Sequence, residues 1–137
     1  MKLLLDTSAY SAFFRGDPRI VPLVQSAREI LLPSIVLGEL FAGFALGNRE
    51  EKNLAELEQF LSSPRVRVVY VMEESARWYS QIYQELRAAG TPVPTNDLWI
   101  AAVTREHGAA LASLDAHFAH IAGLRLLPRQ GERRSRE

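Results

Sequence analysis

Residues 1–10, MKLLLDTSAY, contain the clearest structural signal in the chain. Leu3 to Leu5 follow one another without a polar residue between them, and short continuous apolar runs are typical of strands that are buried on both faces of a sheet. The run stops at Asp6, and Thr7 and Ser8 follow it, so that carboxylate and hydroxyl caps are available for a helix. The segment therefore predicts a buried strand that passes directly into a helix, with a carboxylate at the junction.

Strand and helix signals alternate along the rest of the chain. Apolar runs bounded by Pro, Gly or polar residues predict strands, and apolar side chains at helical spacing predict helices. Strands are expected at residues 29–33, 65–71, 109–114 and 124–128, and helices at residues 8–15, 20–28, 35–47, 54–61, 73–89 and 97–108, with a turn and short helix at 115–123. This order predicts an α/β fold in which a mainly parallel sheet is covered by helices on both faces.

Some of these elements carry more detailed expectations. The segment RVRVVYV, residues 65–71, is the one candidate strand that alternates, so we expect it at an edge of the sheet. Residues 35–47 form a helix that is apolar on nearly every face except at Glu39, which predicts packing on more than one side. Ser34, Asn48 and Asn96 precede expected helices and are predicted N-caps.

The composition is that of a small single-domain protein. With 137 residues, of which 47% are hydrophobic, the chain can bury one core of ordinary size. It has no cysteine, which excludes disulfide bonds, thiolate zinc sites and a cysteine nucleophile. Three leucines before Asp6 are too few for a signal peptide, and no apolar stretch approaches the ~20 residues of a membrane span. We therefore expect a soluble, unprocessed, cytoplasmic protein without membrane contact.

The formal net charge is zero, which argues against a broad basic surface for nucleic acid. The distribution is uneven, because residues 129–137 form an Arg-rich C-terminal tail. A solvated chain end and a contact with RNA or a partner are both compatible with this composition. Five arginines fall in the last thirteen residues of the chain: Arg125, Arg129, Arg133, Arg134 and Arg136.

Four acidic residues stand where a parallel sheet would bring them together. In open parallel sheets, ligands gather outside the carboxyl ends of the strands. Asp6 follows the first expected strand, and Asp115 follows the strand at 109–114. Asp97 opens the helix that leads to that strand, and Glu39 can reach the same edge from the apolar helix after the second strand.

Convergence of these acids would have an electrostatic consequence. Two carboxylates ~4 Å apart at an effective dielectric near 20 repel by roughly 4 kcal/mol, so the cluster should hold protons or a hard cation. Oxygen ligands select Mg²⁺ or Mn²⁺, which can activate water and stabilise the transition state of a phosphodiester. The pattern therefore predicts a metal-dependent nuclease whose catalytic and metal-binding residues are Asp6, Glu39, Asp97 and Asp115.

Each acid also has a purely structural explanation. Asp6 could serve only as an N-cap, and Asp97 only as a first-turn acid that complements the helix dipole. Glu39 could form a buried salt bridge, and Asp115 could be a simple turn residue. The joint placement of the four acids at one edge is what favours the metal site.

Polar residues beside these acids are candidates for a supporting role. Ser8, Asn96 and Ser113 could hydrogen-bond water, metal ligands or phosphate, although helix capping fits them equally well. The three histidines, His107, His117 and His120, do not have the spacing of a closed metal site, so surface or packing roles are expected for them.

The segments LLLDTSAY, PSIVLGELFAG, TPVPTNDLWIAA and LASLDAHFAHIAGLRLL resemble PIN-domain ribonucleases, and among these the VapC-type toxins of toxin–antitoxin pairs. The resemblance covers residues 1–128. It implies a PIN-like α/β/α sandwich and a homodimer. It also implies a divalent cation held by the four acids, and cleavage of structured RNA such as tRNA or rRNA. Many relatives carry Thr where this chain has Ser113, a change that keeps the hydroxyl.

The same resemblance implies a VapB-type antitoxin as partner. In the family, the C-terminal segment of the antitoxin lies in a groove beside the active site. The apolar helix around Phe41 and Phe44 is therefore a candidate contact surface, although these two side chains, three residues apart, could equally pack in the core.

Two other functions remain as alternatives. A receiver-type signalling domain also places acids at strand ends, but it needs an acid pair after the first strand and a lysine near the last one. The only lysines here are Lys2 and Lys52, which disfavours that class. A PIN-like domain that has lost activity and only binds a partner is not excluded by the residues.

Overall fold

The five strands form one sheet in the order β3-β2-β1-β4-β5, in which every neighbouring pair is parallel. This computed structural model describes residues 1–129, and residues 130–137, most of the Arg-rich tail, lie outside the described part. The expected mainly parallel α/β fold is confirmed, as is the edge position of the alternating strand. The strands are β1 (Lys2–Leu5), β2 (Glu29–Pro33), β3 (Val66–Val69), β4 (Ala110–Ala112) and β5 (Arg125–Leu127).

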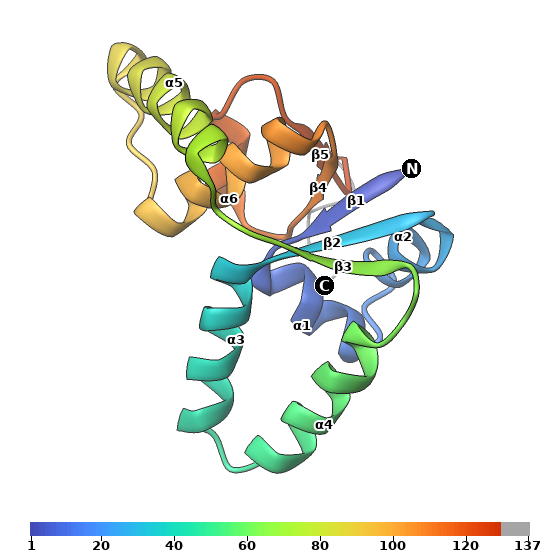
Figure 1. Cartoon of the computed structure of the whole chain (residues 1–137). Coiled ribbons are helices and arrows are strands. Elements are labelled where there is room, and N and C mark those ends of the chain that lie inside the picture. Colours follow the sequence, from blue (N-terminus) through green and yellow to red (C-terminus); the bar gives the residue numbers. More distant parts are fainter. Residues whose placement is uncertain (130–137) are drawn as a thin grey trace, which may run out of the picture.

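Helices cover both faces of this sheet (Figure 1). On one face α5 and α6 pack against each other, and α1, α3 and α4 lie on the other, so the layers form the expected α/β/α sandwich. No helix within residues 1–129 is long and apolar enough to cross a membrane. The helices are α1 (Thr7–Phe14), α2 (Val21–Ser26), α3 (Ser34–Leu46), α4 (Glu50–Leu61), α5 (Glu73–Ala89), α6 (Thr95–His107) and the short 3-10 helix η1 (Ala116–His120).

The central strand β1 organises the core. Leu3, Leu4 and Leu5 are each 0% exposed, because β1 has a paired strand on either side and a helical layer on either face. The chain first builds outward from β1 through β2 and β3, and then returns to the other side for β4 and β5. Such a reversal of strand order opens a crevice at the carboxyl end of the central strand, which is where Asp6 stands.

Several local expectations were wrong. The chain before α3, α4 and α6 provides no side-chain cap, because Pro33, Arg49 and Pro94 occupy the N-cap positions. Ser34 and Asn96 lie inside the first turn of their helices, and Asn48 precedes its helix by one residue too many. Pro33 and Pro94 suit the extended backbone of an N-cap, but they offer no side-chain acceptor to the N–H groups of the first turn.

The expectation that α3 packs on more than one side failed for much of the helix in the single chain, although α3 contacts α1, α4, α6 and β2. Only Val36 and Leu40 of this helix are buried, whereas Phe41 is 47% exposed and Leu46 is 90% exposed. From the end of β2, α3 extends away from the sheet, with α4 as its neighbour (Figure 1). An apolar helix surface is therefore left open to solvent in this chain.

A pair of glycine substitutions tests the helix ends. Gly108 ends α6 with φ of 61°, a left-handed conformation, whereas Gly43 lies inside α3, and a β-carbon at either position meets no atom within 4 Å. Because only backbone conformation differs, we expect Gly108→Ala to lower the free energy of unfolding by about 1 kcal/mol and Gly43→Ala to raise it by about 0.5–1 kcal/mol. Urea unfolding measures both, and equal effects of the same sign would contradict the helix boundaries.

Candidate active site

The four acids of the sequence analysis occupy the carboxyl edge of the sheet. Asp6 directly follows β1, and Asp115 is the N-cap of η1, just beyond the end of β4. Asp97 lies in the first turn of α6. Glu39 lies in the middle of α3, the helix that begins where β2 ends. Four different segments of the chain thus each contribute one acid to the region beyond the ends of β1, β2 and β4.

Asp6 is the most buried of these acids, with a residue exposure of 4%. Its Oδ1 accepts hydrogen bonds from the Ala9 backbone N–H at 2.8 Å and from the Ser8 hydroxyl at 2.7 Å, and its Oδ2 accepts from the Ser113 hydroxyl at 2.5 Å. Burial raises the pKa of Asp6 to about 6, although these three hydrogen bonds favour the charged form. Asp6 is therefore both the N-cap of α1 and a buried carboxyl group at the carboxyl edge of the sheet.

Two serines connect the ends of β1 and β4. The Ser113 hydroxyl donates to Asp6 and accepts from the backbone N–H of Asp115 at 2.9 Å. The Ser8 hydroxyl donates to Asp6 and accepts from the backbone N–H of Leu114 at 3.0 Å. Each hydroxyl thus uses its donor on the buried acid and its acceptor on the loop that carries Asp115, which fixes that loop relative to β1.

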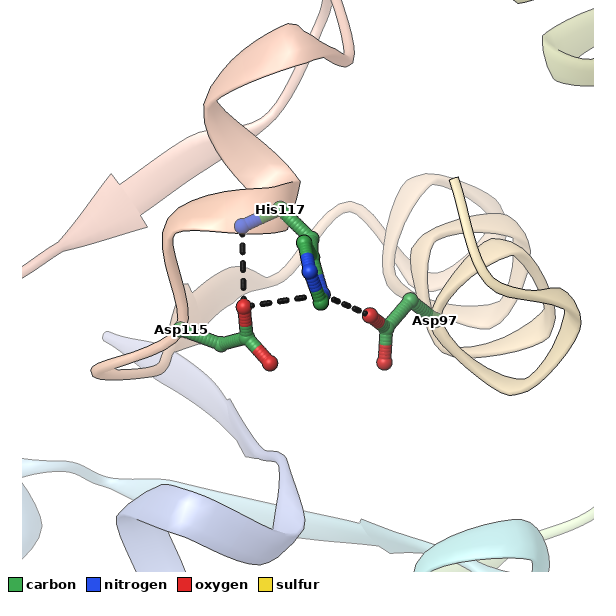
Figure 2. Close-up of side chains that lie close together, drawn as sticks. All are labelled: Asp97, Asp115 and His117. Carbon is green, nitrogen blue, oxygen red and sulfur yellow. Dashed lines mark hydrogen bonds and ion pairs between the residues drawn. The ribbon is translucent and has the colours of Figure 1, made fainter. Parts of the chain in front are cut away.

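Asp97, Asp115 and His117 form a compact cluster. Figure 2 shows the imidazole ring of His117 between the two carboxylates, with its Nδ1 atom 2.8 Å from Asp97 Oδ2 and 3.0 Å from Asp115 Oδ1. One potential ligand atom from each residue lies within 4.8 Å of the others, close enough to share a metal ion. This geometry has the right donor types for a divalent cation.

The electrostatics of this cluster follow from burial and from like charges. Burial raises the pKa of Asp97, and the charges of Asp115 and Glu39 act in the same direction, although the hydrogen bond with His117 opposes the shift. The hydrogen bond to Asp97 and the charge of Asp115 raise the pKa of His117. The imidazolium form of His117 therefore balances part of the negative charge of the two carboxylates.

Glu39 is held by hydrogen-bond donors from two other elements. The Thr7 hydroxyl donates to its Oε1, and the Asn96 amide donates to its Oε2 at 3.1 Å. No lysine or arginine within residues 1–129 forms an ion pair with Glu39, so the buried salt bridge considered for it is absent from this part of the chain. Asn96 and Thr7 each neighbour another acid in sequence, so Glu39 is tied to both Asp97 and Asp6.

Two residues of this network carried no sequence signal. Thr7 contacts Glu39 across thirty-two positions of sequence, a contact that depends on how α1 packs beside α3. The side chain of His117 is 52% exposed, in line with a surface role, but its ring nitrogen touches two of the four acids. Its position two residues after Asp115, at the start of a short helix, was the only available hint.

Comparison with known proteins identifies the family of this chain. The family model described as "PIN domain" matches residues 3–124. The chain belongs to the PIN-domain family. This confirms the resemblance noted in the sequence. The matched residues of this PIN domain include all four acids and His117.

Individual relatives match over nearly the full length of this PIN domain. The plasmid stability protein StbB of Pseudomonas syringae pv. tomato is 31% identical, with 91% of this chain and 96% of the relative covered. Ribonuclease VapC2 of Haemophilus influenzae is 29% identical over the same shares of the two chains. The crystal structure of DNA-bound VapBC from Salmonella typhimurium contains a chain that is 29% identical, with 92% and 96% covered and a TM-score of 0.80.

The raised pKa of Asp6 predicts how the stability of the metal-free PIN domain depends on pH. Between the ordinary pKa of 3.8 and the folded value of about 6, the folded protein holds a proton that the unfolded chain has released. The free energy of unfolding should therefore fall by about 3 kcal/mol as the pH rises through this window. Asp6→Asn should remove the share of this fall that Asp6 contributes, leaving only the smaller decline from Asp97 and, above this window, that from His117, as measured by urea unfolding in EDTA at several pH values.

Asp17 provides the control for that experiment. Hydrogen bonds from Arg19 lower the pKa of Asp17 to about 2, so its contribution is present above the ordinary pKa and is lost only as the pH falls from about 4 to about 2. Asp17→Asn should leave the decline between pH 4 and 6 in place. An unchanged decline in Asp6→Asn would show that the buried carboxyl group does not cause it.

Proposed function

We propose that this PIN domain is a divalent-metal-dependent endoribonuclease that acts as the toxin of a VapBC-type toxin–antitoxin pair and cuts tRNA or rRNA. The observation that carries the proposal is that Asp97, Asp115 and His117 offer ligand atoms within 4.8 Å of one another. Asp6 and Glu39 lie outside this group, but the charge of Asp115 acts on Asp6 and the charge of Glu39 acts on Asp97. The relatives named ribonuclease VapC and the VapBC structure support the activity and the pairing with an antitoxin.

The residues of the cluster fit a Mg²⁺ or Mn²⁺ ion. The donors are carboxylate oxygens, which hard divalent cations prefer. Burial is the main cause of the raised pKa of Asp6 and of Asp97, and the charge of Asp115 acts in the same direction on both, so a nearby cation would favour their charged forms. We assign Asp6, Glu39, Asp97 and Asp115 as the residues that hold the ion directly or through water. When bound, the ion activates a water molecule and stabilises the negative charge of the phosphodiester transition state.

The remaining residues of the site position these acids. Ser8 and Ser113 keep the Asp6 carboxylate fixed while they anchor the loop of Asp115, and Thr7 and Asn96 fix both oxygens of Glu39. Such support holds carboxylates close together against their mutual repulsion. The reaction needs no nucleophilic side chain, because water attacks the phosphorus atom.

The antitoxin partner has a suitable surface on α3. Phe41 is 47% exposed and Leu46 is 90% exposed, while Phe44 is half-buried against the core. Exposed apolar side chains next to a polar site are typical of partner contacts. We propose that a VapB-type antitoxin covers Phe41 and Phe44, that the chain acts as a homodimer, and that it works in the cytoplasm, where its RNA substrates are.

Cleavage assays with single carboxylate variants test the activity. Incubated with Mg²⁺ or Mn²⁺, the wild-type protein should cut tRNA or rRNA, and the variants Asp6→Asn, Glu39→Gln, Asp97→Asn and Asp115→Asn should each lose activity by about a hundredfold or more. Loss of a charge from the cluster weakens metal binding, so the midpoint for Mn²⁺ in a calorimetric titration should also rise.

Glu51→Gln is the matched control, because Glu51 is exposed in the first turn of α4 and remote from the cluster. This variant should cut RNA like the wild type. If the wild-type protein binds metal but cuts no RNA in every preparation, the result would favour the alternative of an inactive PIN-like domain that only binds a partner. Cleavage that survives in all four carboxylate variants would contradict the proposed site.

The described part of the chain ends just after β5, at the carboxyl edge of the sheet, where the acids lie. The backbone N–H of Ser113 donates to the carbonyl of Leu127 at 2.9 Å. The end of β5 therefore lies beside the segment after β4, where Ser113 contacts Asp6. Residues 130–137 themselves lie outside the described structure. We propose that the PIN domain proper spans residues 1–128, and that arginines of the tail, residues 129–137, contact RNA phosphates near the acids.

Truncation after Arg129 tests this role of the tail. The truncated protein lacks Arg133, Arg134 and Arg136. If these side chains neutralise phosphates, RNA binding should weaken, and the slope of log Kd against log salt should decrease by about 2 to 3. Filter binding in EDTA over a range of salt concentrations measures the slope, and an unchanged slope would assign the tail to a solvated chain end.

A further inference from the structure

Two adjoining hollows lie at the amino ends of the strands, the edge of the sheet opposite the acids. The larger one has a volume of about 430 Å³, and its lining includes Lys2, Arg105 and Arg125. The second has a volume of about 330 Å³, and its lining includes Lys2 and Arg28. Met1 and Lys2 line both hollows, so the two lie side by side. We call the set Lys2, Arg28, Arg105 and Arg125 the amino-edge surface.

The topology of the sheet gathers these four cations. Lys2 begins β1, Arg28 directly precedes β2, and Arg125 begins β5. All five strands are parallel, so these starting residues share one edge. Arg105 joins them from the last turn of α6, whose carboxyl end lies at the same edge.

Most of the positive charge of this surface is uncompensated. Arg105 pairs with Glu85 at 3.1 Å, so this arginine contributes little net charge. Lys2 donates from Nζ to the backbone carbonyl of His107 at 3.1 Å, a neutral acceptor that leaves its charge intact. No ion pair within residues 1–129 involves Lys2, Arg28 or Arg125.

Two acidic groups near the surface do not change this balance. Glu29 lines the smaller hollow, but it is paired with Arg67 at 3.1 Å. The carboxyl end of α6 carries partial negative charge, which the bond from Lys2 to His107 offsets. The surface therefore keeps a net positive charge, carried mainly by Arg28 and Arg125.

Arg105 lines the larger hollow with 14% of its side chain exposed. Its guanidinium lies over the ring of Trp78, 5.4 Å from the centroid, which holds the group in place. Gly123 has no side chain at this point, and a β-carbon there would stand 3.2 Å from Arg105 Nε. Trp78 holds the guanidinium in place, and no side chain at position 123 covers it, so its free N–H groups are able to contact phosphate.

We propose that the amino-edge surface binds the phosphate backbone of a folded RNA substrate at a distance from the cleavage site. The inference rests on the proposed ribonuclease function and names its substrate class. Lys2 and Asp6 stand at opposite ends of β1, about 13 Å apart at the rise of an extended strand. β1 is buried beneath helices on both faces of the sheet, so an RNA that reaches both edges must pass around the outside of a helical layer, a longer path than the strand itself. This surface therefore selects folded RNA over short single strands.

Substitution of the two exposed arginines tests the proposal. The double variant Arg28→Gln/Arg125→Gln removes charge without touching the acids, and Arg49→Gln, at the exposed start of α4, is the control. Fluorescence anisotropy in EDTA should show about tenfold weaker binding of unfractionated tRNA by the double variant. The slope of log Kd against log salt should fall by about 2, because two phosphate contacts are lost.

Three outcomes would overturn this proposal. Affinity and salt slope equal to those of the wild type and of Arg49→Gln would show that RNA does not touch this surface. Equal weakening for tRNA and for a short single-stranded oligonucleotide would contradict selection of folded RNA. Calorimetric binding of AMP that the double variant loses, with unchanged tRNA affinity, would assign the hollow to a small phosphate ligand. Because binding is measured in EDTA, an inactive nuclease leaves the test intact.

Discussion

The burial of the Asp6 carboxyl group at the end of the central strand is the constraint around which the rest of the site is arranged. A carboxylate with 4% residue exposure would destabilise the fold by several kcal/mol without donors. Ser8, Ser113 and the backbone of Ala9 provide those donors. The same bonds begin α1 and fasten the loop after β4, so the interactions that make the buried acid tolerable also bring Asp115 to it.

Charge is separated across the sheet even though the chain is neutral overall. The acids gather at the carboxyl ends of the strands, and the uncompensated cations Lys2, Arg28 and Arg125 gather at the amino ends. Helix α6 repeats this arrangement, because Asp97 lies in its first turn and Arg105 in its last. Both placements complement the helix dipole, so the distribution that suits a metal at one edge and phosphate at the other also stabilises the helix.

The sequence was sufficient for the strands and for the placement of the acids, because continuous apolar runs and strand ends are local signals. It failed where a contact depends on tertiary packing. Asn96 was expected as a cap, but Pro94 takes that position and Asn96 instead donates to Glu39 from inside α6. The bond from Thr7 to Glu39 and the position of His117 between two acids depend on how α1, α3 and η1 pack, which no periodicity encodes.

The expectation that failed for α3 bears on regulation. A helix that is apolar all round is normally covered on more than one side, yet α3 leaves Phe41 and Leu46 exposed in the single chain. Glu39 lies on this same helix, two residues before Phe41. Phe41 points to a different side of the helix from Glu39, but the exposed Leu46 is seven residues after Glu39, two turns along the same side. An antitoxin that covers Phe41 and Leu46 therefore extends toward the side of α3 that carries Glu39 and limits the access of RNA to the acids. One helix would then contribute both a site acid and the partner surface, so antitoxin binding and inhibition would be physically coupled.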